Sequence, residues 1–300
     1  MTLRELVAAC AQRLDQAGVC FGQGTGNAFD EAAWLVLWRL GLPLDSDLDE
    51  DDGARAVDAV QRQAVDALIE TRIRTRRPAA YLTGEAWLQG VPFFVDENVI
   101  IPRSFIAELI ADGSVDPWLD AHTRRVLDLC TGNGSLAVLA AMAWPEVEVT
   151  GSDLSPQALA VARRNVERHG LSGRVTLLQS DGLRDVPGRF DLILCNPPYV
   201  NAGSMAALPP EFRAEPALAL AGGPDGMDFV RGLLRDAAGH LTEGGVLVLE
   251  IGHERDHFER AFPRLEPVWL STSAGDEQVL LLAREALTAG LPAGGGTGAA

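Results

Sequence analysis

The sequence predicts an α/β protein in which a mostly parallel, seven-stranded sheet follows a small helical domain. Between residues 126 and 251, strand-like and helix-like segments alternate, which is the order of a parallel sheet with helices on both faces. Two strand-like segments around SAGDE, 268–272 and 278–284, predict an antiparallel pair at its end. Residues 1–83 carry only helical patterns. With 300 residues the chain can form one large or two modest domains.

Three helices are expected in the first 83 residues. Apolar residues with helical spacing mark the first helix, between Leu3 and Leu14. Residues 28–42 form a second, more apolar helix, which Gly41 and Pro43 end. A third helix begins near Val57, after an acidic segment, and Pro78 stops it.

Charged residues surround the third helix. The preceding segment LDSDLDEDDG, residues 44–53, holds much of the acid of the chain, and we expect a solvated loop there. Positive side chains are favourable near a helix C-terminus. We therefore expect the arginines of the last turns to be solvated and to offset the helix dipole, rather than to bind nucleic acid; they are Arg72, Arg74, Arg76 and Arg77.

The segment 84–103 predicts a β-hairpin connector, because it alternates and contains Gly, Pro and an Asp-Glu-Asn turn. The α/β domain then spans residues 104–287. The remaining residues, 288–300, have low complexity, and we expect a disordered tail. Within the α/β domain the parallel strands are expected at 126–129, 147–152, 175–179, 190–195 and 245–251, and the helices at 136–142, 156–169 and 227–241.

Composition restricts the class of protein. No apolar run approaches the roughly 20 residues that cross a bilayer, and the first residues lack a signal-peptide layout, so we expect a cytoplasmic protein. The net charge of −17 should repel a phosphate backbone and attract a basic partner. No C-x-x-C pair is present, so we expect reduced, buried thiols rather than a zinc site or disulfides at Cys10, Cys20, Cys130 and Cys195.

A glycine-rich turn follows the first strand of the sheet. In DLCTGNGSLA, residues 128–137, Gly132 and Gly134 allow a ligand to approach the backbone closely. The string fits G-x-G-x-x-A, and Asp153 ends the next strand, where an acid can hold a ribose hydroxyl. This combination predicts a nucleoside cofactor and leaves open which one.

A third acid, Asp181, follows the next strand and is itself followed by Gly182. Ligands of open α/β sheets gather at the carboxyl ends of the strands. Asp128, Asp153 and Asp181 would thus line one edge, and their charges would repel a pyrophosphate. The acids favour S-adenosylmethionine, with its sulfonium and ammonium, over NAD.

The stretch LILCNPPYV, residues 192–200, places an unusual group at the same edge. A residue before proline is held in an extended conformation, which applies to Asn196 and then to Pro197. Pro198 offers no N–H that could compete for acceptors. The Asn196 side-chain oxygen and the Pro197 carbonyl can therefore each accept one hydrogen of a planar NH2 group, while Tyr199 stacks on it. Holding the nitrogen in line with a methyl donor could supply several kcal/mol.

A zinc-protease pattern, H-E-x-x-H, also occurs at His253–His257. Its middle positions are charged, although a helix that buries zinc should be apolar there, and the sequence offers no clear third ligand. We interpret the match as coincidence and expect no metal.

At NPPY the sequence resembles the bacterial N5-glutamine methyltransferases, a class I, Rossmann-like, S-adenosylmethionine-dependent family, over nearly the whole chain apart from the tail. One branch methylates the GGQ glutamine of peptide-chain release factors, and the other a glutamine of large-subunit ribosomal protein three. The release-factor branch reads PRPETE where this chain reads PRSFIAEL, residues 102–109, similar to PRSPIAEL of the ribosomal branch. Residues 77–104 and the stretch MAALPPEFRAEPALALAGG also resemble that branch.

The resemblance implies roles for individual residues. Residues 1–83 would recognise the substrate, and 104–287 would form the methyltransferase domain. Thr131, Gly132 and Gly134 match the cofactor loop, in which Cys130 replaces a usual glycine. The cofactor-binding set is then Asp128, Thr131, Gly132, Gly134, Asp153, Asp181, Gly182 and Asn196, and the acceptor-binding set is Asn196, Pro197, Pro198 and Tyr199.

The resemblance implies S-adenosylmethionine as cofactor and a basic ribosomal protein as partner. Methylation of release factors and adenine-N6 methylation of nucleic acid remain alternatives with the same NPPY chemistry. The net charge of −17 and the lack of an evident DNA-recognition domain argue against the nucleic acid. An NAD-linked oxidoreductase and a zinc protease are more distant alternatives.

Overall fold

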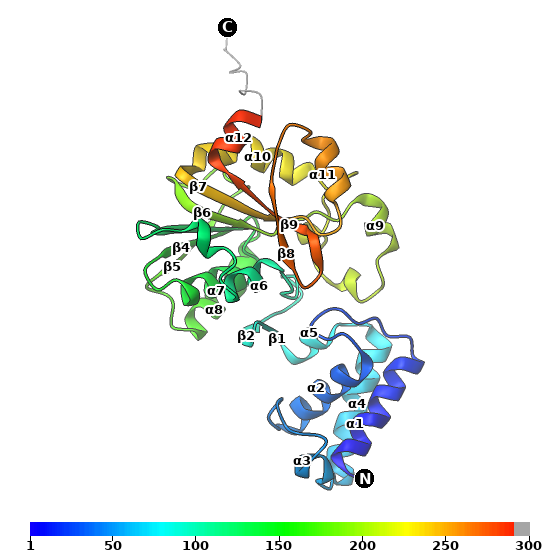
Figure 1. The fold of residues 1–300 in the computed structure, drawn as a ribbon. Coiled ribbons are helices and arrows are strands. Elements are labelled where there is room, and N and C mark those ends of the chain that lie inside the picture. The colour runs from blue at the N-terminus through cyan, green and yellow to red at the C-terminus, as the bar shows by residue number, and fades with distance from the viewer. Residues whose placement is uncertain (291–300) are drawn as a thin grey trace.

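The computed structural model describes residues 1–290. Five helices come first and pack together below the sheet in Figure 1: α1 (Leu3–Gln16), α2 (Ala28–Leu40), α3 (Asp51–Ala54), α4 (Ala59–Thr75) and α5 (Ala79–Thr83). A capping box on Thr2 begins α1, and Gly41 ends α2 in a left-handed conformation with φ 66°. The apolar faces of α1, α2 and α4 share one core, which includes Leu3, Leu35 and Ile69.

An antiparallel hairpin joins these helices to the sheet. It consists of β1 (Glu85–Leu88) and β2 (Val91–Phe94), and Leu88 pairs with Val91 across the turn. The hairpin lies inside the segment 84–103, and its turn is at Gln89 and Gly90. The Asp-Glu-Asn sequence forms a separate turn beyond the hairpin, closed by a hydrogen bond from the Val99 amide to the Asp96 carbonyl.

Seven strands form one sheet in the order β5-β4-β3-β6-β7-β9-β8. The first five strands of this sheet in chain order are parallel: β3 (Arg125–Leu129), β4 (Glu148–Asp153), β5 (Val175–Gln179), β6 (Phe190–Cys195) and β7 (Leu241–Glu250). An antiparallel pair follows, β8 (Val268–Thr272) and β9 (Gly275–Ala283). The predicted mostly parallel, seven-stranded sheet is confirmed. Because β3 lies between β4 and β6, the strand order reverses there, and a crevice opens at the carboxyl ends of these strands.

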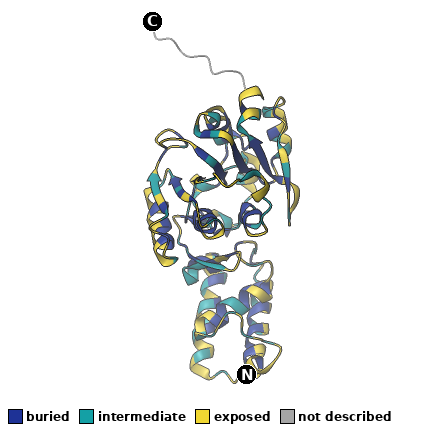
Figure 2. Cartoon of the chain, turned by 60° about the vertical axis from the view of Figure 1, so that its left-hand side comes forward, coloured by how far each residue is buried: buried dark blue, intermediate teal, exposed yellow. Residues whose placement is uncertain are grey.

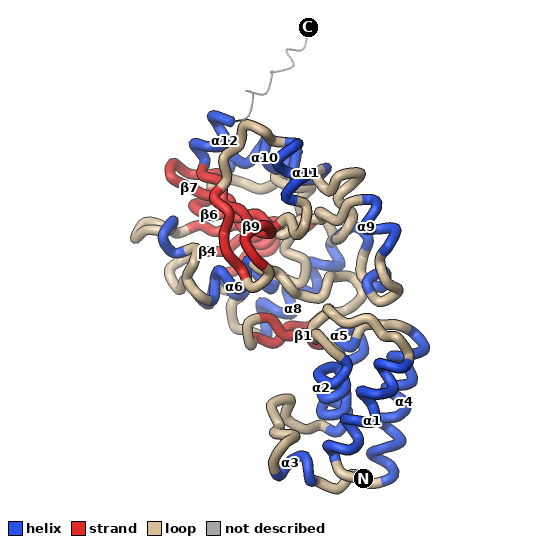
Figure 3. The backbone as a smooth tube through the Cα atoms, turned by 45° about the vertical axis from the view of Figure 1, so that its right-hand side comes forward, coloured by secondary structure: helices blue, strands red, loops and turns tan. Residues whose placement is uncertain are grey.

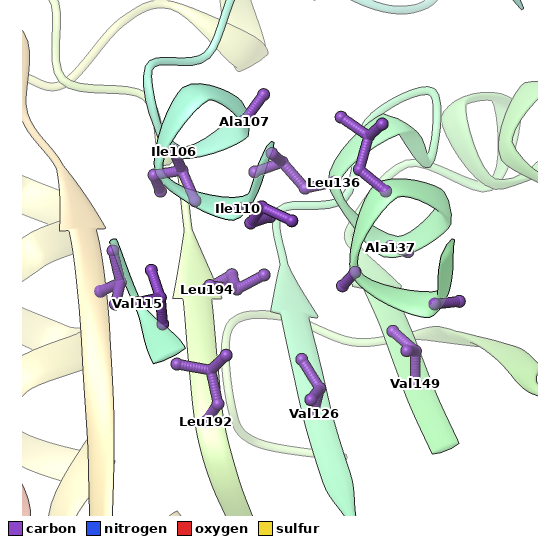
Figure 4. Close-up of a cluster of buried hydrophobic side chains, with 14 of the residues drawn as sticks. Ile106, Ala107, Ile110, Val115, Val126, Leu136, Ala137, Val149, Leu192 and Leu194 are labelled. Carbon is purple, nitrogen blue, oxygen red and sulfur yellow. The ribbon is translucent and has the colours of Figure 1, made fainter. Parts of the chain in front are cut away.

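Helices cover both faces of the sheet, as the buried strands in Figure 2 show. Successive β3 residues serve opposite faces, because Val126 packs in one core and Leu127 in the other. Figure 4 shows Ile106, Ile110 and Leu136 above Val126 and Leu194 on the first face. The helices are α6 (Ile106–Ala111), α7 (Ser135–Ala143) and α8 (Pro156–Arg168) on that face, and α10 (Asp228–His240), α11 (Arg255–Ala261) and α12 (Arg284–Gly290) on the other.

Short helices occupy several segments that the sequence predicted as loops. The helix α3 begins in the acidic segment 44–53 and ends one residue beyond it. The short helices α9 (Ala202–Ala207), η2 (Phe212–Ala214) and η3 (Ala217–Ala219) follow the NPPY motif, and η1 (Asp116–Trp118) precedes β3. The helix α12 contains residues 288–290, which the sequence assigned to the tail, and residues 291–300 lie outside the described residues. All four cysteines are free. No helix within residues 1–290 is long and apolar enough to span a membrane.

The expectation of solvated arginines on α4 is wrong for Arg72. Its side chain is 1% exposed and donates hydrogen bonds to Glu31 Oε1 at 2.7 Å and to the Cys20 carbonyl at 3.1 Å. A second buried carboxylate, Glu211, lies 3.6 Å from its Nη1. Arg76 also donates to Glu211 and to the Ala17 and Gly18 carbonyls at the end of α1. The helical pattern could not reveal this burial, because both carboxylates come from distant segments.

These contacts join the first helices to the loop after NPPY. The tube in Figure 3 shows this loop, with α9, descending towards α5 and the end of α4. Besides the arginine contacts, Glu211 accepts a hydrogen bond from the Cys20 amide, and its carbonyl accepts one from Gln23. Arg74 and Arg77, by contrast, are exposed as expected.

We expect Arg72→Ala to lower the free energy of unfolding by about 3–5 kcal/mol, because it leaves Glu31 buried without its cationic partner and Glu211 with Arg76 alone. The matched control is Arg74→Ala on the exposed side of the same helix, which should cost less than about 0.5 kcal/mol. Urea unfolding followed by tryptophan fluorescence measures both. Equal small effects of the two substitutions would contradict the buried network.

Candidate active site

The carboxyl ends of β3, β4, β5 and β6 surround a cavity of about 140 Å³. Six residues of the predicted sites line it: Gly132, Asp153, Asp181, Gly182, Asn196 and Pro198. They come from the ends of four strands, so the topology brings them together as the sequence predicted. The other walls come from the segment 98–100 after the hairpin, from Pro216 and Leu218 in the loop after NPPY, and from Phe229 on α10.

Asp153 is held in place by backbone amides at the end of β4. Its Oδ2 accepts a hydrogen bond from the Gly132 amide at 2.9 Å, and its Oδ1 accepts one from the Ser155 amide at 2.9 Å. Burial raises the pKa of Asp153, while these hydrogen bonds oppose the rise. The carboxylate is therefore oriented in the cavity wall before any ligand binds, and a ribose hydroxyl could donate to it.

Asp128 does not line the cavity, which corrects the expectation of three acids along one edge. It is 1% exposed, and its Oδ2 accepts hydrogen bonds from the Thr131 hydroxyl and from the Ala137 amide. Burial raises its pKa to about 7. Thr131 is also buried and outside the cavity wall. Both residues lie beneath the glycine-rich turn and hold its shape.

The glycines of the turn serve different purposes. Gly132, with φ 56°, faces the cavity, where a Cβ would meet only the Cys130 carbonyl, at 4.0 Å. Gly134, with φ 81°, packs against α8, because a Cβ would lie 3.1 Å from that of Ala162. Cys130 has φ 62°, a left-handed conformation that costs a non-glycine residue roughly 1–2 kcal/mol. The turn thus keeps its conformation although a cysteine replaces the first glycine.

Asn196 ends β6 at the cavity and is partly exposed. Within residues 1–290 its side chain forms no hydrogen bond, so its amide oxygen is free to accept one. Pro198 lines the cavity, whereas Pro197 is buried behind it. The structure therefore leaves a hydrogen-bond acceptor in the wall of the cavity that Asp153 also lines.

Tyr199 does not line the cavity. Its ring packs on Gly252, where a Cβ would lie 2.5 Å from Tyr199 Cε2, and its hydroxyl donates to Glu250 Oε1 at 3.4 Å. These contacts hold the ring against Gly252 and Glu250, and its stacking on an acceptor stays a prediction.

Phe229 and Glu250 are site residues that the sequence reasoning missed. Phe229 contributes an aromatic ring next to Gly182, where a Cβ would lie 3.9 Å from the ring. Glu250 is fully buried and accepts hydrogen bonds from the Ser104 hydroxyl at 2.6 Å and the Phe105 amide at 2.9 Å. Glu250 thereby connects the PRS segment to Tyr199. No local pattern in the sequence signals this contact, because Ser104 and Glu250 lie 146 positions apart.

A buried ion pair positions the loop after NPPY. Glu215 accepts from both Nη atoms of Arg103, at 2.5 and 2.7 Å, and from the Ile101 amide at 2.9 Å. Such a bidentate pair restricts both position and orientation. Pro216, the next residue, lines the cavity. Neither string, PRS nor FRAEP, carries a local signal that the two meet, because Arg103 and Glu215 lie 112 positions apart.

The H-E-x-x-H residues form structural contacts. Glu254 accepts a hydrogen bond from Asn201 Nδ2 at 2.6 Å and pairs with His257 Nδ1, which ties α11 to the start of α9. Within residues 1–290 no group of three or more possible metal ligands occurs.

The cavity fits S-adenosylmethionine chemically. Carboxylates at Asp153 and Asp181 suit ribose, adenine and cationic groups, and Gly132 lets the backbone approach a ligand closely. Apolar walls from Leu154 and Phe229 suit a purine ring. These residues would hold the cofactor.

Burial raises the pKa of Glu250 to about 7, although its hydrogen bonds lower it. The folded protein then keeps a proton that the unfolded chain, with a glutamate pKa of about 4.3, has released. The group therefore makes the free energy of unfolding fall as the pH rises from about 4.5 to about 7, by about 3 kcal/mol.

We expect Glu250→Gln to remove most of this fall relative to the wild type, because the amide does not titrate. Urea unfolding between pH 5 and pH 8 measures the slope. The exposed control, Glu266→Gln, should keep the wild-type slope. An unchanged slope in Glu250→Gln would show that Glu250 is ionised throughout this range.

The geometry described above agrees with comparisons to known proteins. Residues 115–223 match the family model of the methyltransferase small domain. The ribosomal protein uL3 glutamine methyltransferase of Bordetella pertussis is 54% identical over 289 residues, which cover 95% of this chain and 96% of that protein. The protein of the same name from Burkholderia pseudomallei is 50% identical over 291 residues, covering 94% of each chain.

The solved hMettl16 catalytic domain, in complex with MAT2A 3'UTR hairpin 6, shares the fold at 13% identity with a TM-score of 0.52, over 78% of this chain and 85% of that chain. The class I methyltransferase fold expected from the sequence is confirmed, and so is the family resemblance noted at NPPY. The chain belongs to the family of the ribosomal protein uL3 glutamine methyltransferases.

Proposed function

We propose that this protein transfers a methyl group from S-adenosylmethionine to the side-chain amide nitrogen of a glutamine in ribosomal protein uL3. The observation that carries the proposal is the position of Asn196, whose free side chain lies in the wall of the same cavity as Asp153 and Gly132. The relatives named above, at 54% and 50% identity, support uL3 rather than a release factor as the substrate.

The cofactor supplies an electrophilic methyl group on a sulfonium. Asp153 would accept from the ribose hydroxyls, and Asp181 from the adenine side. Phe229, next to Gly182, would pack against the adenine ring and so provide an aromatic partner, which a glycine cannot do. Asp128, Thr131 and Gly134 would act indirectly, by holding the turn that contains Gly132.

The acceptor amide would be positioned by the NPPY motif. The Asn196 side-chain oxygen and the Pro197 carbonyl would each accept one N–H of the glutamine, which orients the nitrogen and raises its electron density. An amide nitrogen is a weak nucleophile, so positioning contributes most of the rate enhancement. Tyr199 and Pro198 would keep the motif rigid, because the Tyr199 ring packs on Gly252 and its hydroxyl bonds to Glu250.

The charge of the chain suits this substrate. A protein that binds ribosomal RNA needs a basic surface, and a net charge of −17 attracts such a partner and speeds association. We propose cytoplasmic action, where ribosomal proteins are made. We also propose that residues 1–83 recognise the substrate, that 84–103 connect, and that 104–287 catalyse.

The direct test is methyl transfer from labelled S-adenosylmethionine to three acceptors in parallel: uL3, a release factor and duplex DNA. We expect label on a glutamine of uL3 alone. Label on the release factor would refute the assignment of the substrate, and label on DNA alone would refute glutamine as the acceptor.

We expect Asn196→Ala to lower kcat at least 100-fold with little change in cofactor affinity, because the main role of its side chain is to orient the acceptor. Asp153→Asn is the matched control in the same cavity and should mainly weaken cofactor binding. Steady-state kinetics and calorimetric titration with the cofactor separate the two effects. Unchanged turnover in Asn196→Ala would exclude the amide-binding role.

A further inference from the structure

A groove on the helical side of the molecule has no part in the site described above. We propose that it binds a lysine- or arginine-bearing segment of the protein substrate, at a distance from the methylated glutamine. The inference rests on the proposed function, because it concerns how the same substrate is held. The groove has a volume of about 640 Å³, and six residues that line it are Asp30, Ala33, Trp34, Leu44, Asp45 and Trp87.

Two indole rings form the apolar part of the groove. Trp87 lies on β1 between the buried residues Ala86 and Leu88, and it is 44% exposed. Trp34 packs against both the helical core and the core under the hairpin, so its ring is held from two sides. Gly24 lies against this ring, because a Cβ there would be 3.3 Å from Trp34 Cζ3. A rigid aromatic surface loses little entropy on binding.

Carboxylates border the rings. Asp30 and Asp45 line the groove, and both are exposed. Within residues 1–290 neither forms an ion pair; Asp30 accepts only a hydrogen bond from Asn27 Nδ2, at 2.7 Å. The acidic segment 44–53, which contains Asp45, carries six acidic residues and no basic one. This negative charge next to the exposed Trp87 and the partly buried Trp34 suits a cation, which an indole face stabilises by about 0.5–2 kcal/mol.

Charge also decides between possible occupants. A second copy of this chain carries the same net charge of −17 and would be repelled, as would the phosphates of RNA. Residues 291–300 contain no charged and no aromatic side chain, and α12, which precedes them, lies at the end of the molecule opposite α2 (Figure 1). A basic protein segment is the occupant that the groove complements.

The groove is separate from the cavity, but the hairpin and the segment that follows it link the two. Trp87 is on the hairpin, and the segment that leaves the hairpin, Asn98–Ile100, lines the cofactor cavity. A substrate that occupies both sites would gain affinity from the groove without a change in the groups around the reacting nitrogen. The groove should therefore affect KM for the protein substrate and not kcat.

The test uses the full-length enzyme and full-length uL3 at low ionic strength, with initial rates measured against uL3 concentration. We expect Asp45→Lys to raise KM for uL3 about tenfold and Trp87→Ala about fivefold, with kcat within twofold of the wild type. The matched controls are Glu266→Lys, the same charge change on the loop between α11 and β8, and Trp38→Ala, an exposed tryptophan of α2 outside the groove. Both controls should keep the wild-type KM.

Thermal unfolding of all four variants shows whether each is folded. If wild-type enzyme methylates uL3 and both groove variants keep its KM, the groove is not a docking surface, while the proposed function stands. If the wild type does not methylate uL3, the proposed function fails and the inference with it. An equal rise in KM in the control Glu266→Lys would show a general effect of charge, and it would also overturn the docking role of the groove.

Discussion

The cavity depends on the ion pair between Arg103 and Glu215. Glu215 is 4% exposed, and a carboxylate so deeply buried is tolerated only when it is paired and hydrogen-bonded. Glu215 accepts hydrogen bonds from both the Arg103 guanidinium and the Ile101 amide, and it thereby joins the segment after the hairpin to the loop after NPPY. Burial lowers and Glu215 raises the pKa of Arg103, and the net shift is upward, so the guanidinium stays charged.

Other buried glutamates hold the surrounding elements in the same way. Glu211 joins the loop to the first helices through Arg76, and Glu250 joins the PRS segment to Tyr199. The loop that completes the cavity is thus attached to elements more than 100 positions earlier in the chain. An irregular segment can therefore form a defined wall, because the ion pairs and hydrogen bonds of Glu211 and Glu215 constrain its backbone.

Burial of acids within an acidic chain has a cost, which the structure confines to positions where hydrogen bonds compensate. Asp128 and Glu250 both have raised pKa values because burial dominates, and each accepts at least two hydrogen bonds. The remaining acids gather on exposed segments such as 44–53, where water solvates them. The overall negative field therefore comes from the surface and acts on partners, while the buried acids organise the site.

The sequence by itself determined the succession of strands and helices along the chain, the glycine turn after β3, the placement of Asp153, Asp181 and Asn196 at one edge, and the family through NPPY. These follow from local patterns, because alternation and helical spacing locate strand ends, and parallel strands share an edge. Tertiary structure alone decided that Arg72 is buried, that Asp128 lies beneath the turn, that Tyr199 faces Glu250, and that Phe229 reaches the cavity. Each of these depends on a partner far away in the chain, and a contact between distant residues leaves no periodic signal in either segment.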